Sequence, residues 1–321
     1  MNNSSCLQPS PATTVALPII YSCLFPAGIF GNSLAAWICL RTIRRTHHIY
    51  LANLVAANLL VCITMPFLAA YFAHGHRWPH ESAACRITHH VGAVVMHVSM
   101  YMTITILCSI ALSQYATVTR SSGTPRSPAL PGNFHGRLLH EFRRLKLAKY
   151  LCVGIWLTVL FVTVTAITYS EQESAVGEFP TCYNIRVEAG ERPAMIAGFF
   201  ATGCFFLSFM TVLWTYYSLT RHLSRIQKNT CIGVKHLIYK TVKRNILVIQ
   251  MILTVCFLPY HIFRPIFYVL LTDNDCPRLN YLVEIKNLLT CLAAAKSSLD
   301  PVITILLDKT FKKSVYGLFT K

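Results

Sequence analysis

The sequence predicts an all-α membrane protein, a bundle of seven transmembrane helices with a short amphipathic helix after the seventh. Apolar residues make up 54% of the 321 residues and charged residues only 13%, about half the share of a soluble domain. Each of seven apolar stretches offers the roughly 20 residues that a helix needs to cross a bilayer. Helices are expected because lipid offers no hydrogen-bond partner to an open strand edge. The predicted spans are 16–40, 49–73, 86–115, 148–169, 193–220, 241–271 and 279–307.

The basic residues gather on one side of this predicted bundle, which accounts for the net charge of +17. They follow the first and seventh spans and lie between the third and fourth and between the fifth and sixth. By the positive-inside rule these segments are cytoplasmic, and the N-terminus is extracellular at the plasma membrane. Anionic membrane lipids are the expected partners of this charge, and nucleic acid is not. The set between the fifth and sixth spans is Arg221, Arg225, Lys228, Lys235, Lys240, Lys243 and Arg244.

The chain shows no internal repeat and no separate soluble domain. It is expected to divide into an extracellular N-terminus, a seven-transmembrane domain and a cytoplasmic amphipathic helix with the C-terminus, at residues 1–15, 16–307 and 308–321. No Lys or Arg precedes the first span, so we expect an uncleaved signal anchor rather than a cleaved signal peptide. In the last segment Phe311 and Val315 oppose Lys309 and Lys312, a pattern typical of a helix lying along the membrane surface.

Cysteines and glycosylation sequons occur on the predicted extracellular side. An even set of cysteines in an oxidising compartment indicates two disulfides. Asn2 and Asn3 each begin an Asn-x-Ser sequon and are expected glycosylation sites. The remaining cysteines are expected to fill space between helices. The outer cysteines are Cys6, Cys85, Cys182 and Cys276.

Several spans carry short motifs. The sixth contains Cys256, Phe257 and Pro259, and the seventh ends with Asp300 and Pro301. Further landmarks are Gly31, Asn32, Asn53, Asn58, Pro66, Trp78, Trp156 and Tyr217. In this order they resemble the landmarks of the rhodopsin-like (class A) G-protein-coupled receptors, with Phe replacing Trp in the Cys-Trp-x-Pro motif. The resemblance covers nearly the whole chain.

This resemblance implies a receptor that transmits the binding of an extracellular ligand to a heterotrimeric G protein, without a cofactor or a metal. The run from Phe257 to Arg264 is similar to the Phe-x-Pro-x-His-x-x-Arg motif of the purinergic-receptor-like branch. Within that branch the likeness is to an orphan receptor, so no established ligand comes with it. The implied disulfides are Cys85–Cys182 and Cys6–Cys276.

Two prolines are expected to make the sixth span irregular. Pro259 removes a backbone hydrogen bond and should kink the helix. In the family, activation swings the inner end of this helix outward around that kink. Pro265 predicts a second irregularity near the outer end.

The outer halves of the sixth and seventh spans hold the candidate ligand contacts. Charges inside a membrane bundle are costly and usually functional. We expect Arg264 and Lys286 to converge on an anionic ligand, such as a lipid phosphate, a nucleotide or a carboxylate. The third span contains no Asp or Glu, so a biogenic amine is not expected. The candidate ligand residues are Phe257, Tyr260, His261, Arg264 and Lys286.

An alternative for Arg264 and Lys286 stays open. Both side chains can instead pair with nearby carboxylates or extend to the membrane interface. The carboxylates in question are Asp273, Asp275 and Glu284.

A polar site is expected at the middle of the membrane. Most of the family holds a sodium ion beside an Asp of the second span, where this chain has Asn58. Lys296 lies four residues before Asp300, so the two can pair across one helical turn. We expect the Lys296 ammonium to take the place of the sodium ion, close to Asn32 and Asn58, and to make the protein insensitive to sodium.

The inner end of the bundle departs from the family. The third span ends in Ser113, Gln114 and Tyr115, where the family has Asp-Arg-Tyr. Gln114 keeps a hydrogen-bonding capacity, for instance toward Tyr217, but has no charge. Thr304 replaces the last tyrosine of the seventh span. Two interpretations stay open: weak or atypical coupling, or a receptor without an inactive-state ion pair and with some basal activity.

Three other functions compare less well with the sequence than a coupled receptor does. A decoy or scavenger receptor that does not couple is the alternative within this fold. A channel or transporter would show internal repeats and paired broken helices, which the sequence lacks. An enzyme is not expected, because no nucleophile or phosphate-loop motif appears. The adjacent pairs His47–His48 and His89–His90 have no accompanying carboxylate, so no metal site is predicted.

Overall fold

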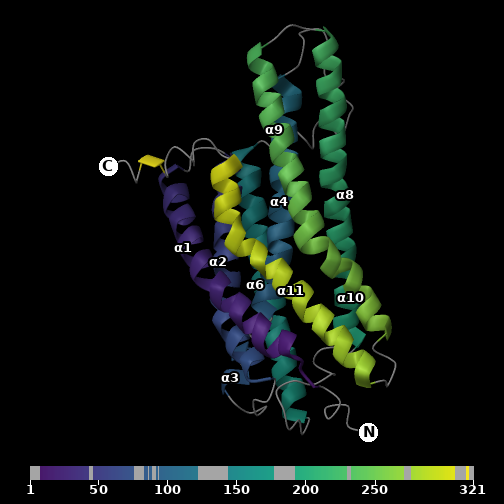
Figure 1. The fold of residues 1–321 in the computed structure, drawn as a ribbon. Helices are drawn as coiled ribbons and strands as arrows, with labels where there is room; N and C mark the ends of the chain where they lie inside the picture. The colour runs from purple at the N-terminus through teal and green to yellow at the C-terminus, as the bar shows by residue number, and fades with distance from the viewer. Residues whose placement is uncertain are drawn as a thin grey trace.

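Seven long helical units run up and down through the computed structural model, each antiparallel to its neighbour along the chain (Figure 1). This arrangement confirms the predicted all-helical seven-transmembrane bundle. The described residues are 8–42, 46–75, 83–85, 87–88, 92, 94–121, 144–176, 192–229, 233–270, 276–307 and 316–317.

The helices have the following bounds. A π-helical stretch, η2 (Ala12–Ala16), leads into α1 (Leu17–Thr42). The next units are α2 (Thr46–Ala73), the short α3 (Ala83–Cys85), α4 (Val94–Ser121) and α6 (Leu145–Val176). The fifth unit is α8 (Arg192–Asn229), the sixth is α9 (Gly233–Ile252), η4 (Leu253–Phe257) and α10 (Leu258–Leu270), and the seventh is α11 (Cys276–Leu307).

Two helices extend well past the spans predicted for them. The 38 residues of α8 make a rod of about 57 Å at 1.5 Å per residue, while the hydrocarbon core is only about 30 Å thick. Figure 1 shows α8 and α9 projecting together beyond the ends of α1, α2 and α11. The basic residues between the fifth and sixth predicted spans therefore lie on helices and not in a connecting loop. The apolar pattern that predicts these spans ends before the helices do.

Five helical segments in the described part of the chain are long and apolar enough by themselves to cross a membrane. They are Ala12–Arg41, His48–Ala73, Val94–Val118, Gly198–His222 and Tyr239–Leu270. In α11 the charges of Lys296 and Asp300 lower the apolar character, yet both side chains are buried. The first segment begins at Ala12, four residues before the predicted start of the first span.

The central helix of the bundle is α4, which packs against α2, α6, α8 and α9. Two of its apolar residues, Ile106 and Ala111, are fully buried in the main core. At the edge of this core the Trp156 indole of α6 donates a hydrogen bond to the Asn53 side chain of α2 at 2.8 Å. Two of the landmark residues of the sequence thus join neighbouring helices.

The sixth unit is irregular where Pro259 predicts it to be. The helix widens into the π-helical stretch η4 just before Pro259 and returns to α-helix at Leu258. A proline cannot donate the backbone hydrogen bond of a regular helix, and a π-helical turn is one way in which a helix adjusts. Pro265 lies inside α10, which stays α-helical, so the expectation of a second irregularity there is wrong.

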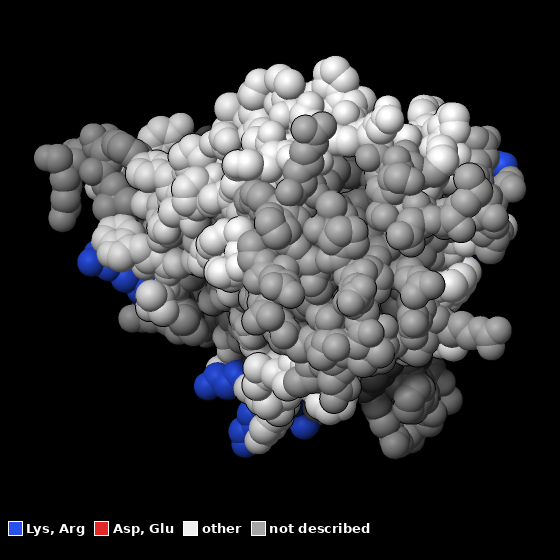
Figure 2. All heavy atoms as spheres, turned by 90° about the horizontal axis from the view of Figure 1, so that it is seen from below, with Lys and Arg blue, Asp and Glu red and all other residues white. Residues whose placement is uncertain are grey.

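The end of the molecule at the N-terminus carries little visible charge. Figure 2 shows this end, with Lys and Arg atoms only toward its rim and no Asp or Glu atom in view among the described residues. The boundaries of the extracellular and cytoplasmic segments themselves stay predictions.

Candidate functional site

The middle of the bundle contains a closed polar cluster built from α1, α2 and α11. The Lys296 ammonium forms an ion pair with the Asp300 carboxylate, and their side chains are 1% and 6% exposed. The Asn58 amide donates to Asp300 at 2.8 Å and to the Asn32 side chain at 3.2 Å. Lys296 also donates to the Asn58 oxygen at 3.4 Å. The predicted pair and its two asparagines therefore meet, and a positive charge of the chain itself occupies the site.

Two glycines let α1 approach this cluster closely. A Cβ at Gly28 would collide with Cys62 of α2 and lie 2.7 Å from the Ser298 hydroxyl of α11. A Cβ at Gly31 would lie 2.9 Å from the Pro301 ring. Because the backbones approach this closely, Asn32 reaches across to the Ser297 carbonyl and donates to it at 2.8 Å.

Toward the outer end, Arg264 of α10 lies in an aromatic environment. Its guanidinium donates to the Tyr101 hydroxyl at 2.6 Å and to the Tyr268 hydroxyl at 3.2 Å. The same group lies 5.8 Å from the ring centres of Tyr260 and Tyr268, in cation–π range. No carboxylate among the described residues contacts it, and Asp273 and Asp275 lie outside the described residues.

His261 lies one turn before Arg264 and is fully buried. Its ring stacks on Phe205 of α8 at 3.9 Å and meets the Tyr101 and Tyr260 rings edge-on. Its Nδ1 lies 2.8 Å from the Phe257 carbonyl, which can only accept, so Nδ1 carries the proton. Its Nε2 is buried and has no hydrogen-bond partner among the described residues. An unpartnered buried nitrogen costs free energy unless a further group binds it.

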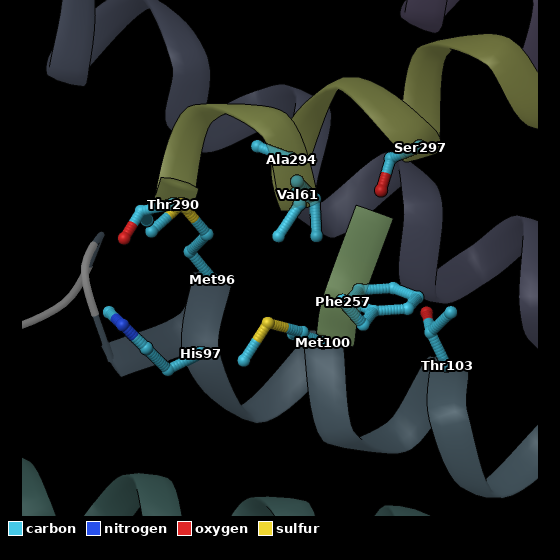
Figure 3. Close-up of a pocket in the computed structure, with 10 residues that line it drawn as sticks. Val61, Met96, His97, Met100, Thr103, Phe257, Thr290, Ala294 and Ser297 are labelled. Carbon is cyan, nitrogen blue, oxygen red and sulfur yellow. The ribbon is translucent and has the colours of Figure 1, made fainter. Parts of the chain in front are cut away.

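A small cavity of about 10 Å³ lies between α2, α4, η4 and α11, enough for roughly one water molecule. Figure 3 shows Met96, Met100 and Phe257 around it. His97 also lines it, and its ring lies 6.1 Å from that of Tyr260.

Lys286, the other cation predicted for the ligand site, lies on α11. Its ammonium lies 5.6 Å from the centre of the Phe267 ring. The Glu284 carboxylate accepts a hydrogen bond from the Ser10 backbone at 3.0 Å. The expected convergence of Arg264 and Lys286 on an anionic ligand stays a prediction.

At the inner end Ser113 is buried. The expected contact between Gln114 and Tyr217 is not formed. The Gln114 side-chain oxygen is buried without a hydrogen-bond partner among the described residues. The Tyr217 ring is 57% exposed and lies under the guanidinium of Arg221. Tyr217 does not reach Gln114 because its side chain lies on the outer face of α8. Adjacent residues on this helix point about 100° apart, so its neighbours face other directions. Tyr115 is buried against Trp214, and Thr304 is half-buried on α11.

Two tyrosines that sequence reasoning missed connect helices at this site. Tyr101 of α4 binds Arg264, and Tyr239 of α9 donates a hydrogen bond to the Val118 carbonyl of α4 at 3.4 Å. Tyr239 is almost fully buried. Each lies far from its partner along the chain, so no local pattern signals either contact.

Some predicted features lie outside the described residues. Cys276 is disulfide-bonded, but its predicted partner Cys6 is not described. Of the amphipathic helix at 308–321 only residues 316–317 are described, and they are helical. The other features not described are Cys182, the glycosylation sites Asn2 and Asn3, and the side chain of Cys85.

Comparison with known proteins agrees with this architecture. The profile of the family described as "7 transmembrane receptor (rhodopsin family)" matches residues 31–130 and 134–303. The chain is 48% identical to "Probable G-protein coupled receptor 82" of Mus musculus, over 100% of this chain and 99% of the relative. It is also 48% identical to the Homo sapiens protein of that name, over 100% of this chain and 96% of the relative.

A more distant relative is "Probable G-protein coupled receptor 34" of Mus musculus, 25% identical over 97% of this chain and 79% of the relative. Both the family profile and the 48% identical relatives extend over most of the seven helices described above. The chain is therefore a multi-pass membrane protein that belongs to the rhodopsin (class A) family of G-protein-coupled receptors.

Proposed function

We propose that this chain is a plasma-membrane receptor, with its N-terminus outside, that transmits the binding of an extracellular anionic ligand to a heterotrimeric G protein. The observation that supports the ligand class is the environment of Arg264. Its guanidinium is held by tyrosine hydroxyls and rings, without a carboxylate among the described residues. A buried charge normally needs an opposite charge, and an anionic ligand group supplies one.

Transmission across the membrane is supported by the connection between the two ends of the bundle. The Arg264 region adjoins η4, where the sixth helical unit is irregular. Below η4 the same unit reaches Tyr239, whose hydrogen bond to Val118 holds α9 against α4. A ligand that changes the packing near η4 therefore acts on the position of α9, the element that borders the cytoplasmic opening of the bundle.

A non-coupling decoy receptor is the second candidate. Gln114 supports it, because an uncharged side chain with an unpartnered oxygen stands where the family has an arginine that contacts the G protein. The same oxygen also supports coupling through a hydrogen bond from the G protein. The two functions differ only in whether nucleotide exchange occurs.

The test is nucleotide exchange in a defined system. The full chain is reconstituted in lipid nanodiscs with one purified heterotrimer from each of the four G-protein classes, and GTPγS uptake is measured. We expect uptake above that of empty nanodiscs for at least one class. Uptake that equals the empty-disc rate for all four, even with Gln114→Arg, would favour the decoy.

A further inference from the structure

We infer that residues 8–16, called here the N-terminal strap, form a lid over one end of the bundle, and that the Glu284 carboxylate of α11 is the latch that holds this lid closed. The strap packs on α1, α2 and α11, whereas the candidate ligand residue Arg264 lies on α10. The inference goes beyond the proposed function, because it concerns how this end of the bundle is closed and not what the protein binds.

Ser10 caps the N-terminus of the first helical unit. Its hydroxyl accepts a hydrogen bond from the Ala12 N–H at 3.1 Å. Its carbonyl accepts from the N–H groups of Thr13 and Thr14 at 3.0 and 2.9 Å. Pro11 is the first helical residue, a position that suits proline because the N–H it lacks would have no partner within the helix. The N–H of Ser10 itself is then left for a partner outside the first helix.

Glu284 supplies that partner from a different helix. Its carboxylate accepts the Ser10 N–H at 3.0 Å. In a capping box this contact is made by a Glu or Gln three residues after the cap, but that position here is Thr13, a buried neutral residue. A carboxylate near a helix N-terminus is also favoured by the helix dipole. Glu284 therefore fixes both the start of the first helix and its place beside α11.

The strap follows α11 in a regular register. The Gln8 N–H donates to the Asn280 side-chain oxygen at 2.9 Å, one turn before Glu284. The two donors are two residues apart on the strap, about 6.6 Å in extended chain, and the two acceptors are four residues apart on α11, about 6.0 Å in a helix. Cys276, one turn earlier, is disulfide-bonded, and its predicted pairing with Cys6 has the same spacing. Successive turns of α11 thus hold the strap.

The strap also reaches α2 and adjoins an apolar cluster. A Cβ on Gly75, the turn residue after α2 with a φ of +58°, would lie 3.5 Å from the Pro9 ring and 3.6 Å from the Thr14 methyl group. Directly after η2, Leu17 and Tyr21 are buried in a cluster with apolar residues of α2 and α11. Release of the strap would therefore expose this cluster to water and free the start of α11.

The test is hydrogen exchange of the full-length receptor in lipid nanodiscs, measured by mass spectrometry over residues 8–16 and 281–288. The wild type should protect both segments. Glu284→Ala should speed exchange in both by about tenfold or more, because a hydrogen bond to a charged group is lost and the lid opens as one unit. Glu284→Gln keeps an oxygen acceptor without the charge and should give a smaller increase.

Two further variants separate the latch from a general loosening of α11. Tyr281→Ala is the matched control, because this residue lies within one turn of Glu284 and its side chain is 65% exposed. It should exchange like the wild type over residues 8–16. Asn280→Ala should speed exchange less than Glu284→Ala, since Asn280 holds only the exposed end of the strap through an uncharged hydrogen bond.

Fast exchange of residues 8–16 in the wild type would overturn the inference, as would equal rates in the wild type and Glu284→Ala. An increase confined to residues 8–16 would overturn the latch as well, because the start of α11 would then not depend on the strap. If Glu284→Ala does not fold, Glu284→Gln and the protection of the wild type still decide. Nucleotide exchange plays no part in these measurements, so failure of the proposed function would appear separately.

Discussion

Lys296 and Asp300 form an ion pair across one turn of α11 that is closed inside the bundle, with Asn58 bound to both partners. The pair places a fixed cation where α1, α2 and α11 meet. It therefore stabilises the packing of these helices through charge as well as through shape.

Replacing Lys296 with Met should destabilise the protein strongly. The Asp300 carboxylate would stay buried without its cation, a change that typically costs about 3–5 kcal/mol. The unfolding temperature of the purified receptor measures this loss. The double variant Lys296→Met, Asp300→Asn should recover much of it, because no unpaired charge remains. A single variant as stable as the wild type would refute the structural role of the pair.

The same pair predicts the response to sodium. In the wild type the unfolding temperature should not change when NaCl is replaced by choline chloride, since the Lys296 ammonium occupies the site. Lys296→Ser removes the ammonium and leaves the oxygens of Asp300, Asn58 and Asn32, donors that suit a hard cation. Sodium should then raise the stability of this variant. A sodium-dependent wild type, or an insensitive Lys296→Ser, would contradict the assignment.

Much of this architecture follows from the sequence, for reasons that lie in local spacing. The seven apolar stretches predict the helices, and the four-residue spacing of Lys296 and Asp300 predicts their pair. The contacts of Arg264 with Tyr101 and of Tyr239 with Val118 were not predicted, because they join helices that are distant along the chain. The lengths of α8 and α9 were missed because apolar character marks the bilayer and not the end of a helix.

Gly28→Ala should weaken the packing of α1. The new methyl group would overlap Cys62 and crowd Ser298, whose hydroxyl donates to the Leu24 carbonyl at 2.9 Å. Overpacking of this kind costs about 1–3 kcal/mol. Gly203→Ala is the matched control, because a Cβ there would meet nothing within 4 Å. The unfolding temperature should fall for Gly28→Ala only, and equal values for the two variants would show that α1 adjusts freely.

Tyr239→Phe should raise basal activity. The change removes the hydrogen bond from Tyr239 to the Val118 carbonyl and keeps the ring. Such a bond contributes about 0.5–1 kcal/mol, so the share of receptors with α9 displaced should rise roughly two- to fivefold. GTPγS uptake measures the effect. Tyr150→Phe, at an exposed position on α6, should leave uptake unchanged, and no difference between the two variants would show that this hydrogen bond does not restrain α9.

The central claim is that this chain couples to a G protein although Gln114 stands where the family has arginine. The most direct measurement is basal activation of the four G-protein classes in cells, with wild type and Gln114→Arg at matched surface expression. We predict activity of the wild type in at least one class and a higher level in the variant, since the arginine restores a charge at the inner end. Activity of the Gln114→Arg variant alone, with a silent wild type, would contradict the claim and identify a competent fold that has lost coupling.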